Sequence, residues 1–400
     1  MVEDTHSFIQ KALERLERWI SYNGWAGFDP YDILQHRAYL RVRHTRYARR
    51  FMEEIMNNQF AMISRKILGI KKNIYAKAMG LFAISYLKYF QITQNEQYLD
   101  KVKECLEWLM THSSEGYHGI CWGYPFDWYT RILIPKEMPS GVVTSFILDS
   151  FIAMYEFTGE GKYWNVVDSA CRFMTQDLKV DRITEDQICF SYTPIDDFHV
   201  LNANLLTGKQ LMYVGTKTNN KEYVDLARRA VNYVIAHQNK DGSWYYRGKP
   251  DHLDYMIDNQ HTGFNLECLF DVYQLDSDQK ILEAIDRGLE YYKKHFVGPN
   301  FETCLYNDTF KHVTINACAE IIICLSRLSR LYPDLLSLAQ GIAEWTINTF
   351  QTHEGYFTYK IYGPLKSKMA FIRAGQAWMM RALSVLLTTE TRPLAIRSDQ

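Results

Sequence analysis

Two short segments of the sequence each combine an aspartate with a histidine. Asp197 and His199 stand close together in one segment, and Asp258 and His261 in the other. Paired carboxyl groups act as general acid and base on glycosidic bonds, and histidine transfers protons near neutral pH. These four residues are therefore the candidate catalytic residues, for acid/base chemistry on a sugar.

Each of the four also has a structural interpretation. Aspartate is a preferred N-cap of helices, and a histidine near a helix start often serves as a hydrogen-bond donor to its surroundings. Both segments precede an apolar stretch with helical periodicity, so capping is a real alternative. The repetition of the pattern in two segments favours a catalytic role.

Further residues in similar positions are predicted to bind the substrate. A flat aromatic ring complements the C–H face of a pyranose, and an arginine can hold a uronate or a phosphate through two hydrogen bonds. The structural alternatives are anchoring of the loops by the aromatic rings and a salt bridge from Arg373 to a nearby aspartate. The predicted substrate-binding residues are Tyr124, Asp127, Trp128, Tyr192, Asp196, Asn202, Asp254, Asn259 and Arg373.

An internal repeat positions these residues. Six segments share an amphipathic helix, a short polar loop and an aromatic-rich extended piece, a pattern typical of stacked modules. Their anchor residues are Trp25, Trp122, Phe190, Trp244, Leu305 and Phe357. More apolar helices are predicted between the anchors, at about 75–91, 142–157, 200–214, 262–273, 314–331 and 369–387. Helices that are apolar all round must be buried, whereas one-sided helices cover them from outside.

The repeat predicts an all-α fold, an (α/α)6 toroid of six helical hairpins that forms a single domain over residues 1–400. The N-terminal helix, at about 7–22, is expected to close the ring as the outer partner of the last apolar helix. Loops into the inner helices gather at one mouth of a central polar cavity, where helix starts point their free N–H groups. The candidate residues fall on those loops, and residues 32–72 form a basic insertion.

Composition excludes some classes of partner. The formal net charge of -1 provides no field that would attract nucleic acid or an anionic membrane. The apolar run at 321–325 is too short to cross a bilayer, so no transmembrane segment is expected. The eight cysteines form no CxxC pair and no metal-ligand pattern with histidine, which indicates free buried thiols and a cytoplasmic protein. No metal and no cofactor is predicted.

Residues 229–244 resemble the QW repeat of terpenoid cyclases and protein prenyltransferases, which are α/α toroids. In that repeat the glutamine caps a neighbouring helix and the tryptophan stacks over it, roles that would fall here to Gln238 and Trp244. The acidic DxDD motif of the polyene-protonating cyclases is absent, since its nearest counterpart at 194–197 lacks the first acid. The resemblance therefore supports the fold rather than cyclase chemistry.

Over nearly its whole length the sequence is similar to the bacterial polysaccharide-biosynthesis proteins of the VpsJ type. Two positions depart from that pattern: Ala374 stands where we expect tryptophan, and 313–316 where we expect a Pro-Ile-Asp run with its acid. The resemblance implies a role among exopolysaccharide proteins, with an oligosaccharide or polysaccharide as ligand, acidic ones included, and the synthesis machinery as partner. It is carried by residues 24–32, 192–204, 257–263 and 373–379.

Several functions fit these observations. A carbohydrate-active enzyme resembling a glycoside hydrolase is favoured over a sugar epimerase or polysaccharide lyase, because carboxylates outnumber histidines on the loops. Histidine chemistry would match the N-acylglucosamine epimerases, which share the toroid. A non-catalytic glycan-binding or scaffold protein is the alternative from another class, since a fold alone does not prove activity. A terpenoid cyclase-like enzyme is the last alternative.

Overall fold

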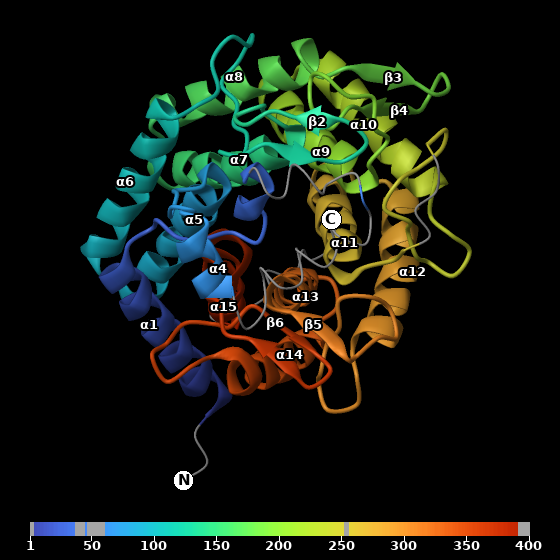
Figure 1. Cartoon of the computed structure of the whole chain (residues 1–400). Helices are drawn as coiled ribbons and strands as arrows, with labels where there is room; N and C mark the ends of the chain where they lie inside the picture. Colours follow the sequence, from blue (N-terminus) through green and yellow to red (C-terminus); the bar gives the residue numbers. More distant parts are fainter. Residues whose placement is uncertain (1–3, 37–44, 46–60, 252–255, 391–400) are drawn as a thin grey trace.

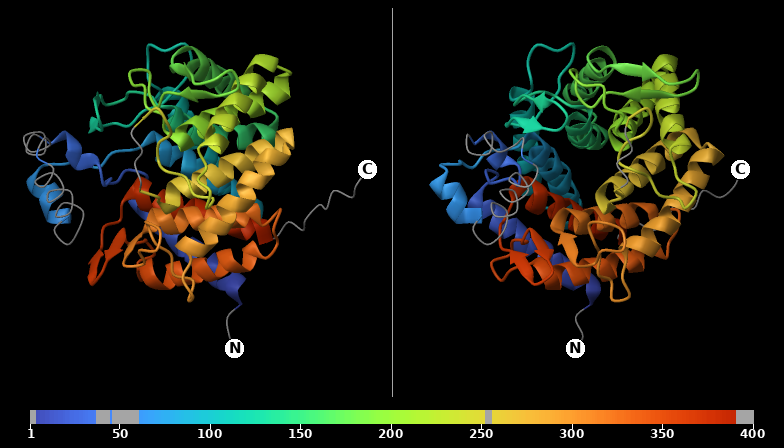
Figure 2. Two further views of the ribbon diagram at one scale, coloured as in Figure 1. Left: turned by 90° about the vertical axis from the view of Figure 1, so that its right-hand side faces the viewer. Right: turned by 45° about the vertical axis from the view of Figure 1, so that its right-hand side comes forward.

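The structure is a computed structural model that describes residues 4–36, 45, 61–251 and 256–390. Most of the predicted basic insertion lies outside the described residues, and so does the predicted site residue Asp254. From the part of the insertion that is described, a short helix, α4 (Ala61–Ile67), and a 3-10 turn, η1 (Asp32–Gln35), stand at one end of the molecule (Figure 2, left).

Apolar helices form the inner wall of a ring, as Figure 1 shows. In the described part of the chain six helices build this wall; each packs against the next, and the last packs against the first. One of them, the second in the order below, is the described helix that is long and apolar enough to cross a membrane. It lies between its two neighbours in the wall. The inner helices are α5 (Ala76–Thr93), α7 (Gly141–Thr158), α9 (Leu201–Thr218), α11 (Asn259–Asp276), α13 (Ile315–Leu328) and α15 (Trp378–Glu390).

Amphipathic helices cover this wall from outside. Each presents an apolar stripe to the inner helix of its own hairpin and a polar face to solvent. In the order of the inner helices they are α6 (Glu96–Thr111), α8 (Gly161–Gln176), α10 (Lys221–Ala236), α12 (Gln279–Phe296), α14 (Leu335–Phe350) and α1 (Thr5–Asn23). The first helix, α1, packs against both α15 and α14, which confirms the predicted closure of an (α/α)6 toroid by the N-terminal helix.

Two glutamines of the described chain, each just after the end of an outer helix, join that helix to the next outer helix of the ring. Gln238 Nε2 donates to the carbonyl of Ala284 in α12, and Trp244 Nε1 donates to a carbonyl in α10. Gln351 Nε2 donates in the same way to the carbonyl of Ala12 in α1. Gln238 therefore contacts the neighbouring outer helix, as expected for the QW segment, but at a carbonyl within α12 rather than at its end. The equivalent hydrogen bond of Gln351 fastens the ring where its two ends meet.

The sixth inner helix begins later than predicted. Residues 369–371 lie outside any helix, and a π-helical turn, η2 (Ile372–Ala377), precedes α15. In this turn Gln376 bonds the backbone N–H and carbonyl of Phe357, and Arg373 pairs with Asp29. Such wide turns mark positions where side chains depart from the helical register. The periodic apolar pattern of the sequence carries no sign of it.

Short strands stiffen the loops that lead from outer to inner helices. Trp128 pairs with Ile134, Val180 with Phe190 and His312 with Tyr362, all antiparallel. The strands form two hairpins and one three-stranded sheet. They are β1 (Trp128–Tyr129), β2 (Leu133–Ile134), β3 (Val180–Arg182), β4 (Ile188–Phe190), β5 (His312–Thr314), β6 (Lys360–Tyr362) and β7 (Leu365–Ser367).

An aromatic layer fills the centre of the ring. Phe146 of α7, Phe264 of α11 and Trp378 of α15 contact one another, with ring centroids 5.1 to 5.6 Å apart. These helices alternate around the wall, so the three rings meet from three sides. We call this group the aromatic layer. It separates an N-terminal side of the ring, where the inner helices begin, from a C-terminal side, where they end.

Candidate functional site

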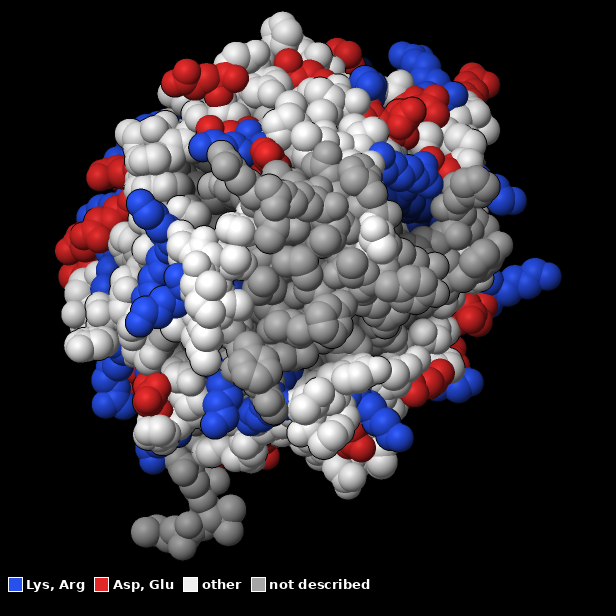
Figure 3. Space-filling model, viewed as in Figure 1, with Lys and Arg blue, Asp and Glu red and all other residues white. Residues whose placement is uncertain are grey.

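The loops at the N-terminal ends of the inner helices carry most of the predicted site residues. Tyr124 and Trp128 precede α7, Tyr192 precedes α9, and Asp258 and His261 stand at the start of α11. This face of the ring is the one turned toward the reader in Figure 1, with the short strands in front. Acidic and basic side chains are interspersed around its described rim (Figure 3).

Asp258 and His261 form a hydrogen-bonded pair. Asp258 is the N-cap of α11: its Oδ1 accepts from the backbone N–H of His261 at 3.0 Å, and its Oδ2 lies 2.5 Å from Nδ1 of that histidine. Asp258 is buried, whereas 35% of the His261 side chain is exposed. Because the carboxylate holds Nδ1, Nε2 is left to exchange a proton with a ligand. The pair therefore has the geometry of an oriented general acid or base.

Two aromatic side chains lie beside His261. The ring of Tyr246 lies 4.5 Å from the imidazole of His261, and the ring of Phe264 lies 6.1 Å from it. Burial raises the pKa of the Tyr246 hydroxyl, so it stays protonated and can donate a hydrogen bond. Trp128 and Tyr192 meet edge to face at 5.6 Å. Their half-buried rings could stack on a sugar, a role that stays a prediction.

His199 faces the other way. Its Nε2 lies 2.8 Å from Asp181 and its Nδ1 lies 3.6 Å from Asp251, and only 6% of the residue is exposed. Its ring lies 6.3 Å from that of Tyr233, which belongs to the outer helix α10. Nε2 is thus held by Asp181 of β3, and Nδ1, which has no hydrogen-bond partner among the described residues, faces Asp251, so this geometry favours the structural alternative for His199.

Other predicted residues are held by their own loops. Asp196 is buried and accepts hydrogen bonds from backbone N–H groups within its loop. Asp127 accepts the N–H of Lys136 at 2.7 Å, which closes the β1–β2 hairpin. The amide of Asn259 donates to Thr303 in the next loop and is fully buried. These contacts explain the three residues as loop-ordering groups.

Arg373 forms the salt bridge that was its structural alternative. Its Nε and Nη2 lie 2.6 and 2.8 Å from the two carboxylate oxygens of Asp29, which is fully buried. The guanidinium also lies 4.9 Å from the ring of Tyr124. The bidentate pair satisfies the charge of Arg373, so this residue supports the site rather than offering a free cation.

The remaining predicted residues differ in exposure. Asp197 is exposed and has no hydrogen bond or ion pair among the described residues. Asn202, in the first turn of α9, is 3% exposed, and its Oδ1 has no hydrogen-bond partner there. Within the described ranges, no group of three or more histidine, cysteine, aspartate or glutamate side chains is placed to hold a metal ion.

Lys77 is a site residue that the sequence analysis missed. It lies in the first turn of α5, and its Nζ stands 3.9 Å from the ring centroid of Phe146 in the aromatic layer. Burial, and secondarily the charge of Arg373, lower the pKa of the Lys77 amino group well below its usual range. The one signal in the sequence is a lysine within the apolar run at 74–87.

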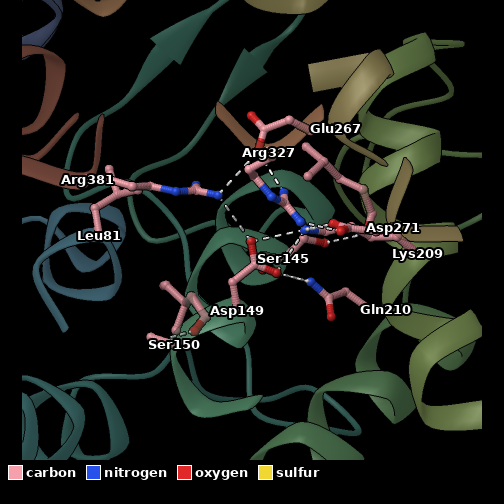
Figure 4. A network of polar contacts seen from close by, with 12 residues as sticks. Leu81, Ser145, Asp149, Ser150, Lys209, Gln210, Glu267, Asp271, Arg327 and Arg381 are labelled. Atoms are coloured by element: carbon pink, nitrogen blue, oxygen red, sulfur yellow. Dashed lines mark hydrogen bonds and ion pairs between the residues drawn. The ribbon is translucent and has the colours of Figure 1, made fainter. Parts of the chain in front are cut away.

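A second polar region occupies the C-terminal side of the ring. A cavity of about 360 Å³ is lined there by each of the six inner helices of the described chain. In Figure 4, Lys209, Arg327 and Arg381 point toward acidic partners. Lys209 lies 2.8 Å from Asp149, and Arg327 lies 2.7 Å from Glu267. The axial cavity thus lies at the end opposite to the predicted mouth.

Comparisons with known proteins support the fold. No family model matches the chain, and no curated protein matches it at the sequence level. Solved structures do match. An unsaturated glucuronyl hydrolase specific for heparin has a TM-score of 0.59 at 12% identity, over 80% of this chain and 87% of the other.

Two further matches carry different activities in their names. A glycosyl hydrolase of family 88 from Bacteroides vulgatus has a TM-score of 0.60 at 10% identity, over 96% of this chain and 100% of the other. The cellobiose 2-epimerase of Bacillus thermoamylovorans has a TM-score of 0.63 at 10% identity, over 78% and 87%. The chain therefore has the α/α-toroid fold of these enzymes. At such identities the likeness extends to the fold alone.

Proposed function

We propose that this protein acts on a carbohydrate and that His261, oriented by Asp258, transfers a proton to or from the sugar. The observation that carries the proposal is the 2.5 Å contact between Asp258 Oδ2 and His261 Nδ1, which fixes the imidazole while its side chain stays 35% exposed. Removal of a proton from the carbon beside a sugar carbonyl, and its return, is chemistry that such a histidine performs. This favours an epimerase or isomerase.

The state of the carboxylates supports the same choice. Hydrolysis of a glycoside needs two carboxyl groups on either side of the bond. Asp196, Asp127 and Asp29 are committed to backbone or arginine partners, and Asp258 is committed to His261. The number of carboxylates on the loops favoured a hydrolase in the sequence analysis. These four, however, already have partners and are not available to flank a glycosidic bond.

Hydrolysis remains the second candidate because of Asp197. Its carboxylate is exposed on the loop before α9 and has no partner among the described residues. Two of the similar structures bear the names of glycoside hydrolases. In this mechanism Asp197 would be one acid, and the group across the bond would be supplied by the Asp258–His261 pair.

The biological setting is a proposal as well. The resemblance to VpsJ-type proteins supports a role in making or modifying an exopolysaccharide, with an oligosaccharide or its precursor as substrate. The eight cysteines are all buried and unpaired, which supports the reducing conditions of the cytoplasm.

Solvent deuterium separates the two reactions. The purified protein is incubated with a panel of mono- and oligosaccharides in D2O, and the products are read by NMR and mass spectrometry. An epimerase or isomerase incorporates deuterium at carbon beside the carbonyl, whereas a hydrolase releases new reducing ends without it. His261→Gln should lower turnover by about 10²-fold or more, because the general base is lost, with little change in melting temperature.

His199→Gln is the matched control. The histidine it replaces stands before the neighbouring inner helix, but both its nitrogens face carboxylates. This variant should lose stability and keep its turnover per folded molecule. If His261→Gln is as active as the parent while Asp197→Asn is inactive, hydrolysis through Asp197 replaces the histidine mechanism. If no sugar is bound or changed, the carbohydrate assignment is wrong.

A further inference from the structure

Lys77 reaches across the centre of the ring. Its Nζ lies 3.9 Å from the ring centroid of Phe146, 5.2 Å from that of Trp378 and 5.7 Å from that of Phe264. Phe264 belongs to α11, the helix opposite α5 in the order of the wall. An amino group in contact with rings from α7, α11 and α15 therefore lies near the ring axis, on the aromatic layer.

This amino group has no acidic partner among the described residues. Lys77 is 6% exposed and makes no ion pair or hydrogen bond there. Two acids act on it through space. Asp29 holds Arg373, and burial raises the pKa of the Glu320 carboxyl well above its usual range, which disfavours its charged form. Burial disfavours the charged form of an amino group without a counter-ion, and an anion beside it would restore that charge, so a lysine in this place favours an anionic ligand.

The surroundings favour an anion on the N-terminal side of the layer. The inner helices begin here, and helix starts carry partial positive charge and unpaired N–H groups. The backbone thus adds to the field of Lys77. The location also connects to the catalytic pair, because Phe264 lies 6.1 Å from His261 and 5.7 Å from Lys77 Nζ. A single sugar above Phe264 is within reach of both side chains.

We propose that Lys77 pairs with the negative group of an anionic sugar, a uronate or a sugar phosphate, bound on the ring axis beside His261. The inference rests on the proposed function, since it names the substrate class of the same site. The aromatic layer forms the floor under the sugar. Lys77 is the residue that distinguishes an anionic sugar from a neutral one, and His261 is the residue that moves the proton.

Binding of three related sugars tests the proposal. D-glucuronate, D-glucose 6-phosphate and D-glucose share a pyranose and differ in charge, and Trp378 beside Lys77 supplies a fluorescence signal. The parent should bind at least one of the two anionic sugars about tenfold or more tightly than glucose, the scale of a hydrogen bond to a charged group. Lys77→Met keeps the length and apolar stem of the side chain. It should remove this preference and leave glucose affinity unchanged.

Lys209→Met is the matched control, because Lys209 is an equally buried lysine on the C-terminal side and is paired with Asp149. It should keep the preference for the anionic sugar. Equal binding of all three sugars by the parent would overturn the role of Lys77 and leave the proposed function standing. Absence of any sugar binding by the parent would end both. Lys77→Gln serves if the methionine variant does not fold, and failure of both to fold would make Lys77 structural.

Discussion

Each side of the aromatic layer holds a buried lysine, and the two lysines differ in whether acidic side chains lie beside them. Lys209, on the C-terminal side, lies 2.8 Å from Asp149 and 3.5 Å from Asp271, and these acids raise the pKa of its amino group although burial alone would lower it. Lys77, on the N-terminal side, has no such partner in the described chain, and burial lowers the pKa of its amino group. Exposure is nearly the same, 7% and 6%.

The difference shows how to tell a structural charge cluster from a binding site in this fold. Cations suit the C-terminal side because six inner helices of the described chain end there with partial negative charge. Those cations are neutralised by acidic side chains beside them, so the cavity that they line is already supplied with counter-ions. Arg381 is the loosest member, with ion pairs of 3.8 and 3.6 Å to Asp149 and Glu267. On the N-terminal side, Lys77 has no acidic partner in the described chain, and the partner that we propose is the negative group of the ligand.

The largest effect should come from Lys209→Met. It leaves Asp149 with Gln210 and the distant Arg381 as its remaining partners in the described network. Removing one member of a buried ion pair costs about 3–5 kcal/mol, so the free energy of unfolding should fall by about 3 kcal/mol in urea titrations. Lys77→Met should cause no comparable loss. Equal losses in both variants would show that Lys77 is held by a partner as firmly as Lys209.

Asp29→Asn should have the next largest effect on stability. It tests whether a buried charge is stabilised by its ion-pair partner rather than by the side of the ring on which it lies. Asp29 is on the N-terminal side but forms a bidentate pair with Arg373. Asparagine keeps one acceptor oxygen and removes the charge, so the free energy of unfolding should fall by about 2–3 kcal/mol. The variant should also bind anionic sugars more tightly, because Arg373 is then left without its counter-ion. A variant as stable as the parent would mean that the pair contributes nothing to the ring closure.

The fold could be predicted from the sequence because it follows from repetition. An amphipathic pattern predicts an outer helix, and an apolar pattern predicts an inner one. The closing role of α1 follows from the six anchor residues, which give six hairpins only if the first helix completes the last one. The π-helical turn before α15 could not be predicted, because its contacts come from distant parts of the chain: Asp29, which pairs with Arg373 in this turn, lies near the opposite end.

The site was less accessible to prediction. His199 and His261 look alike in sequence, yet His261 stands three residues after the N-cap of α11, whereas His199 stands immediately before the N-cap of α9. That change of register turns one imidazole toward Tyr246 and the other toward Tyr233 in the outer layer. Lys77 went unnoticed because the rings beneath it come from distant helices, and a missing counter-ion has no sequence signal.

A smaller effect is expected at the seam of the ring. Gln351 Nε2 donates to Ala12 of α1 at 2.8 Å, as Gln238 Nε2 does to Ala284 of α12 at 2.9 Å. Gln351→Ala should lower the free energy of unfolding by about 1 kcal/mol, and Gln238→Ala by a similar amount. Proteolysis near residues 1–24 should accelerate only in the Gln351 variant, because only there is the bond to α1 lost. Equal proteolysis in both would show that α1 is held by its apolar stripe alone.

The smallest effect is the pH dependence of stability that Lys77 brings, since its contact with the aromatic layer offsets part of the cost of burial. The pKa of its amino group is lowered by folding, so between that lowered value and the usual value near 10.4 the unfolded chain binds more protons than the folded protein. The free energy of unfolding of the parent therefore rises with pH through this window. Lys77→Met lacks the group, so its advantage in melting temperature over the parent should be largest near pH 6 and shrink toward pH 9.5.

Lys209 provides the control. Folding raises the pKa of its amino group, which keeps its contribution to stability fully present below the usual value, and the deficit of Lys209→Met should stay constant over the same range. A Lys77→Met advantage that does not change with pH would show a lysine with an ordinary pKa, and with it the contrast between the two sides of the ring would disappear.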